Sequence, residues 1–226
     1  MILAVLAAGQ QIAMPAGSIP LTAEEGRELL REASRSVAWW ALAPRLETQV
    51  TQANCGPCSA VMVLNGLGVP APESKAHPPY KEFDQLNFFT PGTEAVLPQE
   101  KLQRQGATLE QLGGMLRAHG LHVTVRHAQD SSVEQFRREA SEALGEGGKA
   151  VIINYRRQEL SQEGGGHFSP LGAYHDSDRF LVLDPARYKY PPWWASTEAL
   201  FKSMNTPDTT SGKTRGYLLI GSGPGP

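Results

Sequence analysis

A glutamine placed six residues before a cysteine, with a histidine and an aspartate far downstream, constrains this 226-residue chain more than any other feature. The glutamine is Gln49, and the cysteine opens the motif Cys55-Gly-Pro-Cys58. A glutamine N–H and the backbone N–H of a nucleophile can converge on one oxyanion, and removing such a donor typically slows a reaction by about 10²–10³. The pattern predicts a thiolate nucleophile that accepts an acyl group from an amide.

Spacing alone does not choose between the two cysteines. Gln52 precedes Cys58 by the same six residues, and papain-like proteases use the second cysteine of a Cys-Gly-x-Cys motif. The first cysteine of that family normally forms a disulfide with a later cysteine, and this chain contains only two cysteines. A general peptide-processing protease that uses Cys58 therefore stays open as an alternative.

Cys55-Gly-Pro-Cys58 also matches a redox dithiol, in which the first cysteine lies at a helix N-terminus that stabilises its thiolate. Such a motif should follow a strand in a βαβ unit. Here it follows the polar segment 48–54, which shows no buried-strand pattern. A thiol redox or metal-binding protein is the second alternative, and Cys58 by itself is typical of a small buried helix residue.

A cysteine nucleophile needs a base, and the base needs an acceptor that orients it. His167 follows Gly164–Gly166 and begins an apolar segment, so the imidazole would face open space on a rigid strand. Asp184 ends the next predicted strand. A turn at 175–178 would join the two strands and bring His167 and Asp184 to the same end of the sheet.

Composition excludes several classes of protein. The formal net charge of -2 gives no electrostatic footprint for nucleic acid, so we expect no nucleic-acid partner. No segment is long enough to span a membrane, because the apolar start Met1–Ala8 is short and lacks a basic region before it. It fits a trimmed signal peptide and an ordinary start equally well, so bacterial cytoplasm and periplasm both stay open. His119, His122 and His127 are scattered and lack a cysteine, so we expect no metal site.

The order of elements, helices first and then mostly strands, predicts an α+β fold. Residues 22–221 form one predicted domain, preceded by a flexible N-terminus or signal remnant at 1–21 and followed by a flexible tail at 222–226. Capping boxes at Thr22 and Thr108 start two helices. We expect helices at 22–35, 55–67, 108–120, 131–144 and 196–204, and strands at 121–125, 151–155, 168–174, 180–184 and 216–220. The segment 38–54 should be irregular or extended, and 70–107 should be a long loop with short helical pieces.

Two downstream blocks carry a family resemblance. Gly165–Tyr174 and Leu183–Trp193 resemble the catalytic domain of phytochelatin synthases, above all the short bacterial forms. Further similar positions are Thr48-Gln49, Cys55-Gly56, Val63–Asn65, Arg137 and Met204-Asn205. The similarity spans residues 22–220. It implies a papain-like cysteine peptidase fold, with a helical half packed against an antiparallel sheet half.

The resemblance implies a catalytic triad of Cys55, His167 and Asp184, with Gln49 in the oxyanion hole. It selects Cys55 because the family carries a small non-nucleophilic residue where Cys58 stands. Cys58 is thus a departure, either a spectator or a thiol that could oxidise with Cys55. The implied substrate contacts are Arg187, Tyr190, Gly165 and Gly166.

The implied activity is that of a glutathione gamma-glutamylcysteinyltransferase. The nucleophile would release glycine from glutathione and pass γ-Glu-Cys to water or to a second glutathione. Heavy-metal ions would enter through glutathione, with a cadmium or zinc thiolate as acceptor, and no tightly bound cofactor is expected. The cysteine-rich C-terminal region of the plant enzymes is missing from the sequence, and a homodimer stays open.

Overall fold

The computed structural model describes residues 12–15, 17–75 and 77–222. Of the two segments predicted to be flexible, residues 1–11, 16 and 223–226 lie outside the described residues. Within the described ranges, seven strands form an antiparallel sheet in the order β1-β6-β5-β4-β3-β9-β2. They are β1 (Ile19–Pro20), β2 (His122–His127), β3 (Lys149–Arg156), β4 (Gly166–His175), β5 (Arg179–Val182), β6 (Trp193–Ser196) and β9 (Gly216–Gly221), and β7 (Pro207–Asp208) pairs separately with β8 (Lys213–Thr214).

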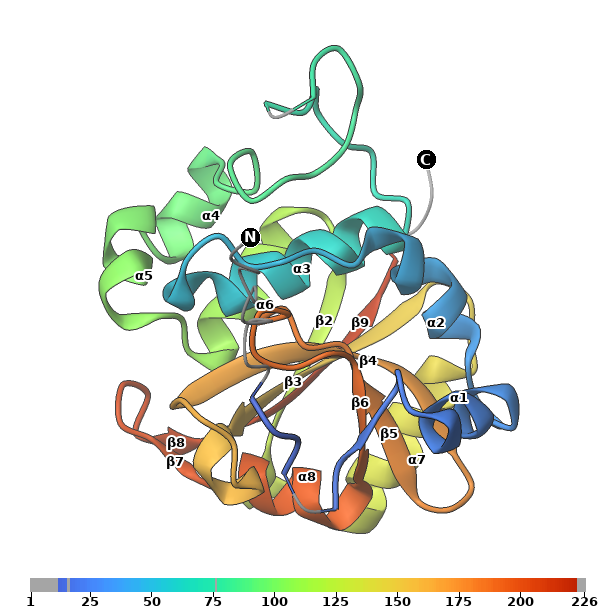
Figure 1. Cartoon of the computed structure of the whole chain (residues 1–226). Coiled ribbons are helices and arrows are strands. Elements are labelled where there is room, and N and C mark those ends of the chain that lie inside the picture. Colours follow the sequence, from blue (N-terminus) through green and yellow to red (C-terminus); the bar gives the residue numbers. More distant parts are fainter. Residues whose placement is uncertain (1–11, 16, 76, 223–226) are drawn as a thin grey trace, which may run out of the picture.

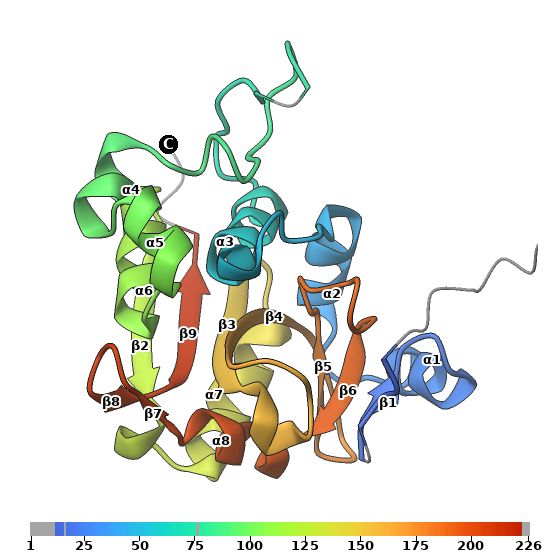
Figure 2. The same ribbon diagram turned by 60° about the vertical axis from the view of Figure 1, so that its left-hand side comes forward.

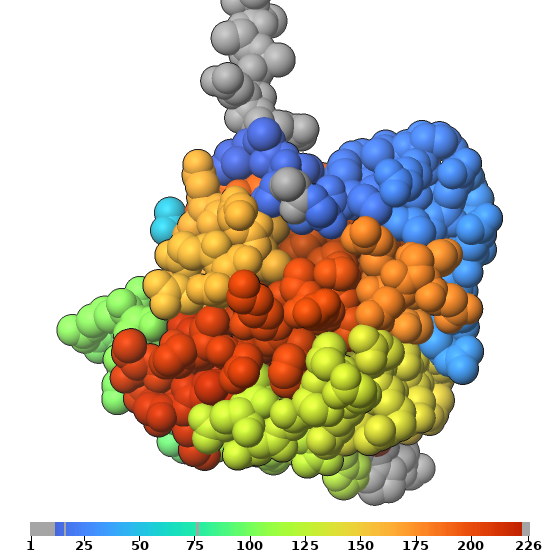
Figure 3. All heavy atoms as spheres, turned by 90° about the horizontal axis from the view of Figure 1, so that it is seen from below, coloured from blue at the N-terminus to red at the C-terminus, as the bar shows by residue number. Residues whose placement is uncertain are grey.

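Helices cover both faces of this sheet. One side carries α3 and α6, and the opposite side carries α7 and α8 (Figure 1). Seen from below, α7 and α8 form much of that second face (Figure 3). The helices are α1 (Glu24–Arg31), α2 (Val37–Leu42), α3 (Cys55–Gly66), α4 (Pro91–Val96), α5 (Gln99–Gln105), α6 (Leu109–Ala118), α7 (Val133–Leu144) and α8 (Thr197–Met204), with short 3₁₀ turns η1 (Ala43–Arg45), η2 (Gln52–Asn54), η3 (Ala128–Asp130) and η4 (Arg157–Leu160).

Helix α3 is the element that positions the site. All of its residues from Cys55 to Leu64 are buried, because α2 and α6 flank it and β4 lies beneath it (Figure 2). A helix that is apolar all round belongs inside a protein. The predicted α+β class, with a helical half packed against an antiparallel sheet half, is confirmed.

Most predicted elements appear near their expected bounds, and the segment 38–54 is the main exception. It was expected to be irregular, but it contains α2, η1 and η2. Helix α2 has no side-chain cap and two tryptophans, so its local sequence gives little helix signal. Burial of Ala38 and Leu42 in the common core stabilises it instead.

The two capping predictions have opposite outcomes. Thr108 caps α6 in a reciprocal box with Gln111, as predicted. The box predicted at Thr22 is wrong, because α1 starts after Ala23 without a side-chain cap. In addition, Ile19–Pro20 pairs with β6, so the sheet already begins within the predicted flexible segment 1–21.

Candidate active site

Cys55 is the first residue of α3, where backbone N–H groups face outward and favour an anion. Its side chain is nearly buried, with 8% of its surface exposed. Burial opposes ionisation, but the hydrogen bond and positive charge of His167 outweigh it and lower the pKa of Cys55 below the ordinary value. The backbone N–H groups of Phe168 and Gly56 act in the same direction. Cys55 is therefore built to be a thiolate.

Cys58 has the opposite environment. Its side chain is 0% exposed. Burial, with the nearby negative charge of Glu47 as the next cause, raises the pKa of Cys58 far above the ordinary value. A buried protonated thiol is a poor nucleophile. Burial thus separates two cysteines that the glutamine spacing left equivalent, in favour of Cys55.

His167 and Asp184 meet as the hairpin prediction requires. His167 Nε2 donates to Asp184 Oδ1 at 2.9 Å, which leaves Nδ1 for the cysteine. Burial opposes the charge on both groups, but their mutual attraction outweighs it. The result is a raised pKa for His167 and a pKa of about 2 for Asp184. The aspartate is thus a fixed anion that orients the base and favours its protonated form.

A β-bulge in β4 makes this contact possible. The pairing changes from Ala173↔Leu181 to Leu171↔Val182, so β4 contains one extra residue, at Gly172. With this shift Asp184 lies opposite Ser169, on the face that also carries His167, because alternate strand residues share a face. Without the extra residue, Asp184 would lie on the opposite face of the sheet.

Arg157 completes the site and was not predicted. Its Nη2 lies 2.8 Å from both carboxylate oxygens of Asp184, and its Nη1 donates to Gln162 Oε1 at 2.7 Å. The guanidinium also lies 5.3 Å from the ring centre of Tyr190. Only 3% of the Arg157 side chain and 0% of the Asp184 side chain are exposed. The only sequence signal was a charged residue just after a buried strand.

Gln49 lines a small hollow beside His167, and two hydrogen bonds hold its side-chain N–H groups. Its Nε2 donates to Thr51 O at 2.8 Å and to the Tyr188 hydroxyl at 3.1 Å. An oxyanion would therefore have to replace one of these two acceptors. Tyr188 is 53% exposed and lines the same hollow, so its hydroxyl is the acceptor that can move aside.

Two small polar hollows flank the triad and share Gly166. One, of about 190 Å³, borders Cys55 and is also lined by Asn154, Asp208 and Arg215. The other, of about 70 Å³, borders His167. It is lined by Gln49, Gln52, Arg157, Gly164, Gly165, Gly166, Ala186, Tyr188 and Lys189. A substrate bound across Gly166 would present one end to the cysteine side and the other to the histidine side.

The four predicted substrate contacts fall in different places. Gly165 and Gly166 line the hollow on the His167 side. Arg187 points to a neighbouring hollow, where its Nη1 approaches Leu46 O at 3.4 Å. Tyr190 is 1% exposed, and its hydroxyl accepts the backbone N–H of Glu163 at 3.0 Å. Its ring packs against the guanidinium of Arg157.

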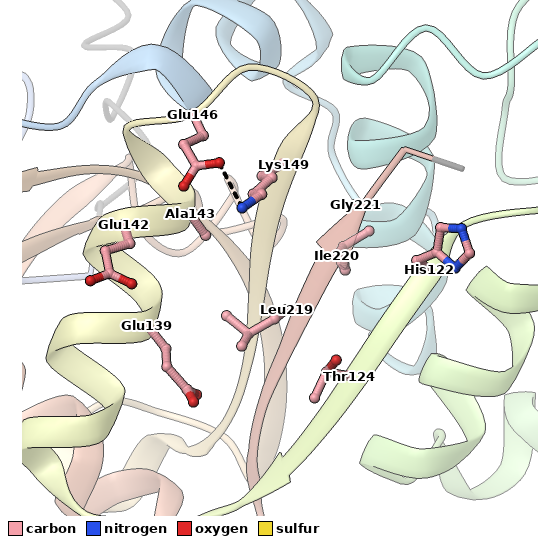
Figure 4. A pocket seen from close by; sticks show the side chains of 10 residues that line it. All are labelled: His122, Thr124, Glu139, Glu142, Ala143, Glu146, Lys149, Leu219, Ile220 and Gly221. Atoms are coloured by element: carbon pink, nitrogen blue, oxygen red, sulfur yellow. Dashed lines mark ion pairs between the residues drawn. The ribbon is translucent and has the colours of Figure 1, made fainter. Parts of the chain in front are cut away.

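A larger hollow of about 290 Å³ lies on the other side of the sheet, between α7 and the strands β2 and β9 (Figure 4). Two of its three glutamates, Glu139 and Glu146, form ion pairs. Glu146 pairs with Lys149 at 2.6 Å, and Glu139 accepts from Arg126 at 3.3 Å. No cysteine lines this hollow. This hollow therefore offers no thiol nucleophile, and the candidate active site is the one on the opposite side of the sheet, beside Cys55.

No cluster of three or more metal-ligating side chains occurs among the described residues. Two of the three histidines considered from the sequence have different hydrogen-bond partners. His119 Nε2 bonds Phe88 O, whereas His127 contacts Thr214 O and Glu110. In the same described part of the chain, no helix has the length and apolar character needed to cross a membrane.

Comparison with known families finds one whose model matches this sequence. The family model described as phytochelatin synthase matches residues 9–217, which is most of the chain. The chain belongs to the phytochelatin synthase family. The resemblance inferred from the sequence motifs is thereby confirmed.

Similar proteins carry the corresponding enzyme names. Glutathione gamma-glutamylcysteinyltransferase 3 of Lotus japonicus is 33% identical over 207 residues, covering 90% of this chain and 42% of that protein. The Schizosaccharomyces pombe glutathione gamma-glutamylcysteinyltransferase is 31% identical over 183 residues, covering 80% of this chain and 43% of that protein. This phytochelatin synthase family member thus spans less than half the length of these relatives.

A solved structure of the Prevotella intermedia interpain A cysteine protease also matches, with a TM-score of 0.41 and 11% sequence identity over 91% of this chain and 95% of that chain. A likeness at this level is too distant to support a statement about function. The chain's own structure shows a cysteine at a helix start together with a histidine and an aspartate on an antiparallel sheet.

Replacement of Gln49 by Ala should lower kcat for this phytochelatin synthase family member by about 10²–10³, with a much smaller change in KM. The reason is that the amide would act on the oxyanion of the transition state more than on the bound substrate. Gln52→Ala is the matched control, because Gln52 is exposed and is the glutamine that precedes Cys58, not Cys55, by six residues. A larger loss in Gln52→Ala would contradict the assignment.

The rate should depend on pH in a predictable direction. The active form needs an ionised Cys55 and a protonated His167, and their pKa values shift down and up respectively. Activity should therefore rise as pH passes the lowered cysteine value and fall as pH passes the raised histidine value. Because Cys55 and His167 interact, the acid and alkaline limits of the rate are properties of the pair and not of either residue alone. Asp184→Asn should move the alkaline limit to lower pH, which steady-state pH profiles would detect.

Proposed function

We propose that this chain is a glutathione gamma-glutamylcysteinyltransferase that acts through a thioester on Cys55. The observation that carries the proposal is the Cys55–His167–Asp184 arrangement between two small polar hollows that share Gly166. Such a site suits a short, highly charged tripeptide better than an extended polypeptide. The family membership and the names of the similar proteins support the same reading.

The proposed reaction follows from the roles of the side chains. Cys55 Sγ attacks the carbonyl carbon of the Cys–Gly amide, and Gln49 with the Cys55 backbone N–H stabilises the oxyanion. The C–N bond then breaks, and His167 gives its proton to the departing glycine amine. A γ-glutamylcysteinyl thioester remains on Cys55. Water, or the α-amine of a second glutathione, attacks this thioester while His167 takes up a proton.

The hollow beside Cys55 suits the γ-glutamyl end of the donor. A glutamyl α-carbon carries one ammonium and one carboxylate, and the lining supplies Asp208 and Arg215. Arg215 is half-buried and fixed by Thr206 Oγ1 at 3.2 Å, so it would offer a pre-oriented cation. Asn154 adds an acceptor, because its buried Oδ1 lacks a hydrogen-bond partner among the described residues. Burying an unpaired acceptor is costly, and a bound ammonium or amide N–H would remove that cost.

The hollow beside His167 suits the leaving glycine. Its volume of about 70 Å³ leaves little room for a side chain, and Lys189 supplies a cation for the glycine carboxylate. The leaving amine must lie near the acid that protonates it. The predicted roles of Arg187 and Tyr190 as substrate contacts stay predictions, with Arg187 the better placed because it is exposed.

Metal ions would enter as the glutathione thiolate complex that serves as acceptor. Cadmium or zinc should therefore raise formation of the transfer product, whereas glycine release from glutathione alone should change little. Parallel assays of free glycine, γ-Glu-Cys and phytochelatin-2 over a metal titration would check this. An equal metal response of both branches would contradict it.

The test of the proposed function is to incubate the protein with glutathione, quench it in acid and measure its intact mass. We expect one γ-Glu-Cys group on the protein and free glycine in solution. A longer peptide with an internal Cys–Gly bond should give neither. Rapid cleavage of that peptide, with no acyl-enzyme from glutathione, would indicate a general cysteine protease instead.

A further inference from the structure

The two cysteines lie on the same turn of α3, and both are free thiols. Residues three apart in an α-helix are surface neighbours, and helix geometry puts their Cα atoms about 5 Å apart. Disulfides typically join residues whose Cα atoms are about 4.4–6.8 Å apart. The backbone therefore allows a bond between Cys55 and Cys58.

The start of α3 can also adjust to such a bond. Cβ atoms three residues apart in a helix lie about 5–6 Å from each other, and a disulfide needs about 3.8 Å. The first four N–H groups of a helix have no intrahelical partner, and Pro57 has no N–H at all. Moving Cys55 toward Cys58 therefore breaks few backbone hydrogen bonds.

Access to the two sulfurs is strongly asymmetric. Cys55 lines the hollow of about 190 Å³, whereas Cys58 is 0% exposed. An oxidant in solution can therefore reach Cys55 but not Cys58. Any oxidation of Cys58 in the folded protein has to pass through the sulfur of Cys55.

We propose that Cys55 and Cys58 form an intramolecular disulfide by exchange with glutathione disulfide, with Cys58 as the resolving cysteine. The proposal rests on the proposed function in one respect, namely that a glutathione unit fits the hollow beside Cys55. It gives a role to Cys58, the cysteine that stands where the family carries a small non-nucleophilic residue. Oxidation would remove the nucleophile Cys55, and reduction would restore it.

The exchange takes two balanced steps. Cys55 thiolate attacks one sulfur of glutathione disulfide, forms a mixed disulfide and expels one glutathione thiolate. Cys58 then attacks Cys55 Sγ while its proton passes to the departing sulfur of the second glutathione, which leaves as a thiol. Because burial keeps Cys58 protonated at rest, this second step is the slower of the two. The protein dithiol is oxidised by two electrons, and one glutathione disulfide becomes two reduced glutathiones. Activity thus follows the ratio of reduced to oxidised substrate.

The experiment treats the reduced full chain with glutathione disulfide, denatures it in the presence of N-ethylmaleimide and measures its intact mass. We expect the wild type to be lighter by two hydrogens, to bind no maleimide and to regain its mass and both thiols with dithiothreitol. Cys58→Ala and Cys58→Ser should stop with one glutathione attached. Cys55→Ala should gain no glutathione while it stays folded.

Three outcomes would overturn the proposal. They are a wild type that stops with glutathione attached, a wild type in which both thiols still bind maleimide, and a Cys55→Ala variant modified at Cys58. The mass readout needs no turnover, so it is independent of the proposed function. Disulfide formation in a protein that never releases glycine would refute only the proposed function, and glycine release without disulfide formation would refute only this proposal.

Discussion

Cys55→Ser should lower the rate of glycine release from glutathione by about 10⁴-fold or more, which is the scale seen when a nucleophile of a catalytic triad is removed. The lowered pKa of Cys55 depends on its hydrogen bond to His167, and a serine hydroxyl would stay protonated under the same conditions. No acyl-enzyme should appear in the intact mass. Protein stability should change little, because the replacement preserves the shape of the side chain.

Cys58→Ala is the matched control for this change. Cys58 belongs to the same helix turn but is fully buried and holds a protonated thiol. Under reducing conditions the variant should keep glycine release within about threefold and lose roughly 1 kcal/mol of stability. Full activity in Cys55→Ser, or loss of the acyl-enzyme in Cys58→Ala, would indicate that Cys58 is the nucleophile.

Arg157→Leu should have the second large effect. It removes the cation from a buried pair and leaves Asp184 with one fewer partner, which typically costs about 3–5 kcal/mol. For a chain of this size that corresponds to a lower Tm by roughly 2–4 °C for each kcal/mol. Glycine release should fall as well, because Asp184 would hold His167 less firmly. Thermal unfolding and steady-state assays would measure the two effects.

Arg156→Leu provides the control for Arg157, since Arg156 is the exposed neighbour at the end of β3. It should leave both Tm and the rate nearly unchanged. The pH profile separates positioning from stability alone. If Arg157 only stabilises the fold, the variant assayed well below its Tm would keep the wild-type pH limits. The expected result is an alkaline limit at lower pH. Arg157 holds Asp184 in place, and the charge on Asp184 raises the pKa of His167, so a less firmly held Asp184 would raise that pKa less.

Local patterns in the sequence predicted much of the framework. The apolar run after Cys55, the alternation of the strands and the capping box at Thr108 are short-range signals, and the corresponding elements appear near their expected bounds. The segment that became α2 gave no such signal. Its helix depends on burial of Ala38 and Leu42 against distant parts of the chain, which no local window contains.

The sequence by itself determined which residue types could perform acyl transfer: a glutamine–cysteine pair, a glycine-flanked histidine and an aspartate at a strand end. Only the tertiary structure decided how they act together. Burial distinguished Cys55 from Cys58, the bulge at Gly172 turned Asp184 to the face of His167, and Arg157 reached Asp184 from the turn η4 that follows β3. Each of these depends on contacts between segments far apart in the chain, because burial and strand register are properties of the packed whole.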